Sequence, residues 1–87
     1  MSRARDEALI KAFAVVLRQA RLRCEMTQEE VARRAGIDRT FIGLLESSKR
    51  QPTLSVISSL EKALSEAPGS LVAKAVALSE ETGSRNS

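Results

Sequence analysis

The chain has 87 residues, of which 43% are hydrophobic and 29% charged, and it carries a formal net charge of +3 at pH 7. A chain of this length and composition folds as one small globular domain and leaves no room for a second. Because it has one cysteine and no histidine, we expect no disulfide, no metal site, no cofactor and no enzymatic activity.

The first predicted helix spans residues 6–23. Apolar residues recur there at three- and four-residue steps, as on the buried face of an amphipathic helix: Leu9, Phe13, Val16, Leu17 and Leu22. The opposite, polar face carries Arg18, Arg21 and Arg23. We expect Arg18 and Arg21 to be structural, one of them pairing with Glu46.

Two short helices follow, separated by a glycine turn. Thr27-Gln28-Glu29-Glu30 is a capping box, in which the threonine hydroxyl and the second glutamate satisfy each other's backbone amides. Gly36 ends this helix, because glycine readily adopts the left-handed conformation. Asp38 is the expected N-cap of a third helix, Arg39 to Glu46. The inward-facing residues of the two helices are Val31, Ala32, Ala35, Ile42 and Leu45.

A fourth helix is predicted after the polar loop 47–52, with Thr53 as its N-cap and its end near Ala67. Its apolar side consists of Val56, Ile57, Leu60 and Leu64. Pro68-Gly69-Ser70 interrupts the pattern, and a fifth helix is expected from Leu71 to about Glu80. Cys24, between the first two helices, is expected to pack as a small hydrophobe.

The fifth helix has more apolar surface than a terminal helix needs to cover its own small domain. We expect this surface to form a homodimer interface, made by Leu71, Val72, Ala75 and Val76. The alternative is that the helix only closes the core of its own domain. The predicted domain spans residues 1–81, and residues 82–87 have no apolar side chain and form a flexible tail.

The distribution of charge and of aromatic residues favours duplex DNA as the partner. Residues 1–50 carry eleven Lys/Arg against seven Asp/Glu, whereas residues 51–87 carry three against four. Basic character in the first half suits a polyanion, although soluble helices are often rich in lysine and arginine. Two aromatic residues provide no stacking platform for single strands. No apolar run could span a membrane or act as a signal peptide, so a cytoplasmic protein is expected.

Two short helices around a glycine turn are the geometry of a DNA-binding helix-turn-helix. The chain also carries several motifs in order: Thr27-Gln28-Glu29-Glu30-Val31-Ala32, Ala35-Gly36-Ile37-Asp38-Arg39-Thr40-Phe41-Ile42, Glu46, and Arg50-Gln51-Pro52-Thr53-Leu54. Together they resemble the Cro/cI-repressor-like helix-turn-helix family, from about Phe13 to Leu64. The resemblance implies an all-α, lambda-repressor-like domain of five helices. Asp38-Arg39-Thr40 is similar to the opening of the recognition helix in restriction-modification controller proteins.

The resemblance implies base-reading roles for Arg39, Thr40, Gly43 and Arg50. Arg39 can give a bidentate pair to guanine, and Thr40 can bind a base or a phosphate. Gly43 either lets the helix approach the groove closely or makes room for a neighbouring side chain.

Backbone-binding roles follow for Thr27, Gln28, Phe41, Ser47, Lys49 and Gln51. Thr27 and Gln28 lie where free helix amides meet phosphate, and Gln28 can also brace Arg39. Phe41 either packs on the first helix or contacts sugar and methyl groups. Relatives often have Gly or Asn where this chain has Ser47-Ser48, and this departure affects the reach of Lys49 and Arg50.

These features predict a homodimeric transcription regulator that binds a near-palindromic operator. It would be the controller of a restriction-modification operon, and its occupancy near a promoter would block or recruit RNA polymerase. The alternative is a phage-type repressor or an antitoxin-like module whose main partner is a protein.

Overall fold

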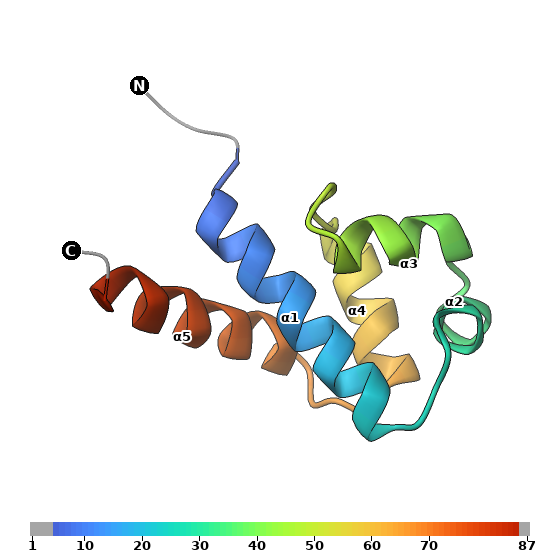
Figure 1. The fold of residues 1–87 in the computed structure, drawn as a ribbon. Helices are drawn as coiled ribbons and strands as arrows, with labels where there is room; N and C mark the ends of the chain where they lie inside the picture. The colour runs from blue at the N-terminus through green and yellow to red at the C-terminus, as the bar shows by residue number, and fades with distance from the viewer. Residues whose placement is uncertain (1–4, 86–87) are drawn as a thin grey trace.

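The computed structural model describes residues 5–85, and the side chains of residues 5–82. Within this range the chain forms five helices and no strand, so the predicted all-α class is confirmed. The helices are α1 (Glu7–Arg23), α2 (Gln28–Ala35), α3 (Arg39–Glu46), α4 (Leu54–Ala63) and α5 (Ser70–Arg85). In Figure 1, α1 runs diagonally through the middle of the molecule, with α5 along one side and α2, α3 and α4 on the other.

Side-chain caps begin the first four helices, at the predicted residues Thr27, Asp38 and Thr53 and at Asp6, which the sequence analysis placed inside the first helix. Asp6 accepts a hydrogen bond from the amide of Leu9, Asp38 from that of Thr40, and Thr53 from that of Val56. The capping box at Thr27 is complete, since the Glu30 carboxylate also accepts from the Thr27 amide at 2.8 Å. Each cap satisfies an amide that has no partner within the helix.

The turn between α2 and α3 is made by Gly36, which has a φ of +69°. In this conformation its amide donates to the carbonyls of Ala32 and Arg33, and the amide of Ile37 donates to Ala32 at 2.9 Å. These bonds end α2 and redirect the chain at once. The glycine turn predicted from the sequence is therefore confirmed.

One core joins all five helices, with α1 at its centre. Its largest fully buried side chains come from every helix: Leu17, Val31, Ile42, Leu45, Leu60 and Leu71. Phe41 and Cys24 are half-buried and pack against this core. Cys24 Sγ also lies 3.5 Å from the carbonyl oxygen of Leu64.

Two predictions for α1 were wrong. Leu22 is 52% exposed, so the apolar face stops short of it. Arg21 is buried rather than on the polar face, because its guanidinium is enclosed by hydrogen-bond partners from α3 and from the turn before α2.

The ends of α4 and α5 also differ from prediction. Helix α4 ends at Ala63, four residues before the expected position, because Ser65 takes a left-handed conformation with φ +57°. Helix α5 continues past Glu80 to Arg85. Its first turn is held by Glu61, a buried carboxylate that accepts from the amide of Leu71 at 3.2 Å.

The flexibility expected of residues 82–87 stays a prediction, and residues 86 and 87 lie outside the described range. Among the described residues no helix combines the length and hydropathy that membrane crossing requires.

Candidate nucleic-acid interface

The face of α3 that points away from the core is open. Ile42 and Leu45 are buried against α1 and α2, and this fixes the rotation of the helix. Arg39 and Thr40, in its first turn, are exposed. Among the described residues the Arg39 side chain has no hydrogen-bond or ion-pair partner. The first turn of α3 therefore presents a free guanidinium and a free hydroxyl to an outside partner.

The other end of α3 is fixed to the domain by a buried ion pair between Arg21 and Glu46. Arg21 Nε donates to Glu46 Oε2 at 2.7 Å and Nη2 donates to Oε1 at 2.9 Å. Arg21 Nη1 donates to the carbonyl of Met26 at 2.9 Å. The side chains of Arg21 and Glu46 are 10% and 3% exposed. The hydrogen bonds to Glu46 raise the pKa of Arg21 and outweigh the opposite effect of burial.

Gln28 joins this pair at the first residue of α2. Its Nε2 donates to Glu46 Oε1 at 3.1 Å, so Gln28 is held by Glu46 and not by Arg39. The expectation that Arg18 or Arg21 pairs with Glu46 is met by Arg21, whereas Arg18 is exposed. The ion pair and Gln28 link α1, α2 and α3, which sets the position of α3 relative to the start of α2.

Gly43 lies beside Gln28 with room to spare. A Cβ built on Gly43 would be 3.7 Å from Gln28 Oε1, which is an ordinary van der Waals contact. Among the described residues, beyond the two chain neighbours and the helix backbone, it would meet no other atom within 4 Å. Packing inside the domain therefore does not require a glycine here, although glycine is unfavourable within a helix.

The start of α2 and the start of α3 meet at one open hollow. It is lined by Arg21, Thr27, Gln28, Glu29 and Arg39. The hollow thus brings together Thr27, Gln28 and Arg39, which the sequence singled out. The Thr27 hydroxyl is already the cap acceptor for the Glu30 amide, at 3.0 Å. Hydrogen bonds from the Thr27 amide and hydroxyl lower the pKa of Glu30 and so favour the ionised form of its carboxylate.

The loop after α3 turns sharply at Ser48, which has a φ of +65°. Ser47 Oγ donates to the Leu44 carbonyl at 3.3 Å, and the Lys49 amide donates to the same carbonyl at 2.9 Å. Ser48 thus takes the left-handed conformation that Gly or Asn usually adopts after the end of a helix. The loop leaves Lys49, Arg50 and Gln51 exposed.

Phe41 is half-buried and packs against the core. It also lines a shallow hollow with Ile37, Thr40 and Leu44. Part of the Phe41 ring therefore packs on the domain, and the rest of the ring remains accessible to a partner.

The residues expected at a dimer interface are divided by the fold. Leu71 and Ala75 are 0% and 1% exposed because they fill the protomer's own core. In this arrangement they have no surface left for a partner, which corrects their assignment. Val72 is half-buried and Val76 is 37% exposed.

Two surface residues were missed from the sequence. Leu54, the first residue of α4, is 86% exposed, and it falls outside the apolar spacing of that helix. Arg5, before α1, reaches the carbonyl of Ser48 with its Nη2 at 3.4 Å. Leu54 directly follows Thr53, the N-cap of α4, and this position would have indicated its exposure. No local sequence pattern indicates that Arg5 contacts Ser48.

A short helix, a glycine turn and a second helix with an open first turn define the class of helix-turn-helix proteins. A family model described as helix-turn-helix matches residues 17–70. The chain therefore belongs to the helix-turn-helix family, as its motifs predicted.

Solved structures of restriction-modification controller proteins have the same fold. C.AhdI from Aeromonas hydrophila is 32% identical to the chain, with a TM-score of 0.69 over 71% of this chain and 94% of C.AhdI. C.Esp1396I is 26% identical, with a TM-score of 0.72 over 80% of this chain and 90% of its own.

The C.Esp1396I tetramer in complex with its natural 35 base-pair operator is 25% identical, with a TM-score of 0.73 over 82% of this chain and 93% of that chain. No curated protein sequence matches the chain. It is a helix-turn-helix DNA-binding regulator that resembles the controller proteins.

Proposed function

We propose that this protein is a sequence-specific transcription regulator that binds duplex DNA as a homodimer and controls a restriction-modification operon. The observation that carries the proposal is the open first turn of α3, where Arg39 and Thr40 are exposed and Arg39 has no partner among the described residues. A helix with this exposure can enter the major groove with its first residues on base edges.

Base reading is assigned to Arg39, Thr40, Gly43 and Arg50. Arg39 donates two N–H groups from one edge of its guanidinium to guanine O6 and N7, and Thr40 donates to a base or a phosphate. Gly43 lets the base edges approach the helix backbone, because no side chain of the described residues occupies the space of its missing Cβ. Arg50 reaches the groove from the loop after α3.

Backbone binding is assigned to residues on both sides of α3. Gln28, held by Glu46, lies in the first turn of α2 with Thr27, where helix amides and the helix dipole favour phosphate. Lys49, Ser47 and Gln51 bind phosphate from the loop, and the accessible part of Phe41 contacts sugar. These contacts position the protein and do not depend on sequence.

The homodimer is proposed to form through the exposed apolar residues of α4 and α5. Val76 and Val72 on α5 supply the part of the predicted interface that is not buried in the protomer, and Leu54 adds an exposed leucine on α4. Two-fold symmetry would place two α3 helices about 34 Å apart, one turn of DNA, on a near-palindromic site. Bound near a promoter, the dimer would block or recruit RNA polymerase.

The controller role is supported by the likeness to C.AhdI, at 32% identity, and by the operator complex of C.Esp1396I, which contains a tetramer. Two dimers of this protein bound to adjacent sites would form a tetramer of the same kind on DNA.

Selection of bound sites from a random duplex library tests the proposal. We expect the selected sites to share a two-fold symmetric sequence whose half-sites lie about one helical turn, roughly 10 base pairs, apart. Recovery of unrelated sequences, or affinity that does not fall with added salt, would favour a module whose main partner is a protein.

A further inference from the structure

The residue before α1 contacts the loop after α3, although 43 positions separate them in the chain. Arg5 Nη2 donates to the backbone carbonyl of Ser48 at 3.4 Å. In Figure 1 the N-terminal end of α1, the loop between α3 and α4, and α3 itself all lie on the upper side of the molecule. Arg5 is therefore placed beside the proposed DNA surface.

The contact places Arg5 beside two cations of the loop after α3. Lys49 and Arg50, the two residues that follow Ser48, are exposed and have no side-chain partner among the described residues. Two acidic residues follow Arg5: Asp6, whose carboxylate caps α1 through the Leu9 amide, and Glu7, whose Oε2 accepts from the Arg5 Nε at 2.6 Å. Glu7 is 64% exposed and Arg5 40%, so the ion pair is weak and readily replaced. The Nη1 donors of Arg5 have no partner in the described part of the chain.

We infer that Arg5 binds a backbone phosphate of duplex DNA, next to the phosphates that Lys49 and Arg50 bind. The inference rests on the proposed function. An exposed guanidinium can donate two parallel hydrogen bonds to phosphate, and each such contact displaces a counterion from the DNA. The helix-turn-helix match begins at residue 17, so this contact lies outside the shared motif and extends the binding surface beyond it.

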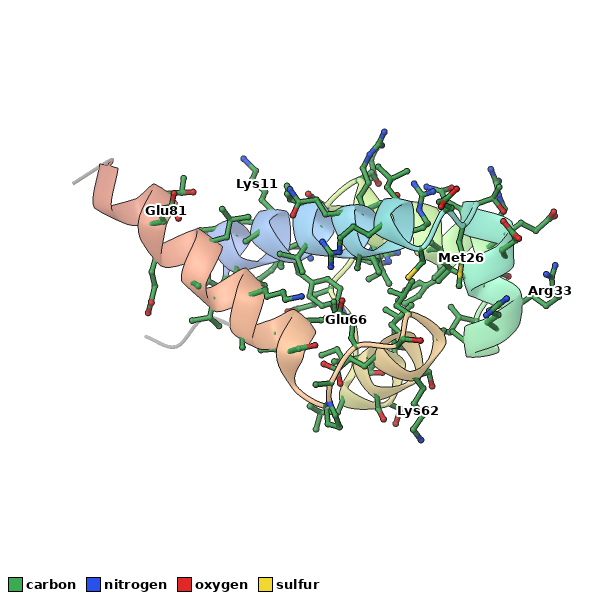
Figure 2. The ribbon with its side chains drawn as sticks, turned by 90° about the horizontal axis from the view of Figure 1, so that it is seen from below. Lys11, Met26, Arg33, Lys62, Glu66 and Glu81 are labelled. Atoms are coloured by element: carbon green, nitrogen blue, oxygen red, sulfur yellow. The ribbon has the colours of Figure 1, made fainter. Side chains whose placement is uncertain are left out.

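The test compares Arg5→Gln with the unmodified protein on a random-sequence duplex at several salt concentrations. We expect the slope of log affinity against log salt to fall by about 0.9, the change for one phosphate contact. Lys62→Gln removes the same charge at the end of α4 far from the loop (Figure 2) and should leave the slope unchanged. Both positions are exposed, so neither substitution should disturb folding. Equal thermal unfolding temperatures for the two variants and the unmodified protein would confirm this.

The outcomes separate this inference from the proposed function. If Lys49→Gln lowers the slope and Arg5→Gln does not, Arg5 makes no phosphate contact, whereas the regulator proposal stands. If the unmodified protein binds the duplex without salt dependence, the proposed function itself fails.

A second variant, Glu7→Gln, should change the affinity for DNA in the opposite direction. Glu7→Gln frees the Nε of Arg5 and should tighten binding to the same duplex. The gain should be larger in the unmodified protein than in the Arg5→Gln background, because it acts through Arg5. An equal gain in both backgrounds would overturn the inference, since Glu7 would then act only through the net charge.

Discussion

Arg39 and Glu46, the first and last residues of α3, occupy opposite environments. Arg39 is exposed and unpaired within the described chain, whereas the Glu46 side chain is 3% exposed and accepts hydrogen bonds from Arg21 and Gln28. A buried carboxylate that lost these donors would carry a large desolvation cost. The residues of α3 therefore divide into a fixed end that holds the helix and an open end that is available to DNA.

Replacing Arg39 with alanine should weaken binding to the selected operator by about 1 to 3 kcal/mol, the usual value of a bidentate base contact. The variant should also lose base preference at one position in each half-site. Affinities for the operator and for variants changed at each position measure both effects. Unchanged discrimination between operator and scrambled duplex would remove Arg39 from base reading.

Replacing Gly43 with alanine should have opposite effects on folding and on binding. The free energy of unfolding should rise by about 1 kcal/mol, because alanine is the better helix former and its Cβ would meet only Gln28 Oε1, at 3.7 Å. Affinity for the operator should fall by about 1 to 3 kcal/mol, the cost of an extra methyl group in a close contact.

Urea denaturation and operator titration of this variant are measured side by side. If both stability and affinity rise, the glycine does not face DNA. If stability falls, the space at Gly43 is smaller than its geometry indicates.

At the scale of the elements, the turn between α2 and α3 sets the direction of α3. Its left-handed residue, Gly36, makes the two hydrogen bonds that end α2, and Asp38 then caps α3 through the Thr40 amide at 2.9 Å. Two residues thus separate the end of one helix from the cap of the next, an arrangement that Arg21, Glu46 and Gln28 reinforce from the other end of α3.

Replacing Gly36 with alanine should lower the free energy of unfolding by about 1 to 2 kcal/mol, the cost of the left-handed conformation for a residue with a Cβ. The cost should come from the backbone alone, since an added Cβ would meet no atom of the described chain within 4 Å beyond the two neighbouring residues. Gly69→Ala is a matched control, with a φ of +85° and equally open surroundings. A much larger loss for Gly36 than for Gly69, by urea denaturation, would contradict this account.

At the scale of the whole molecule, Glu66 connects segments that are far apart in sequence. Its carboxylate accepts hydrogen bonds from Ser70 Oγ at 2.7 Å, Lys74 Nζ at 3.0 Å and Arg23 Nη2 at 3.1 Å. In Figure 2, Glu66 lies between α5 and the rest of the domain. The hydrogen bond from Ser70, followed by that from Lys74, lowers the pKa of Glu66 below its ordinary value.

This shift makes stability depend on pH in a defined direction. A lowered pKa in the folded state means that the contribution of Glu66 is complete above the ordinary carboxyl pKa, near 4.3, and is lost as the pH falls through the folded value. Glu66→Gln should therefore cost about 1 kcal/mol at pH 7, the upper end for exposed ion pairs. The cost should shrink below about pH 4.

Denaturation of Glu66→Gln and the unmodified protein between pH 3 and pH 7 measures this difference. Glu80→Gln, at an exposed position on α5, controls for the loss of one negative charge. A cost that stays constant over the whole pH range would mean that Glu66 contributes through packing and not through its charge.

Local sequence determined the starts of the first four helices and the glycine turn. Each depends on residues within about one turn of helix, such as the Thr27–Glu30 box and the Asp38 cap. The motifs around them also indicated the family, which the match over residues 17–70 confirms.

Tertiary structure alone decided which polar and apolar side chains meet across the domain. The bond from Arg21 to Glu46 spans 25 positions, that from Gln28 to Glu46 spans 18, and that from Arg5 to Ser48 spans 43. Leu71 and Ala75 are apolar residues that could serve a dimer or a core, and only the packing of α5 along α1 assigns them to the core. Periodicity gives the spacing of a face, whereas burial depends on the partner that covers it.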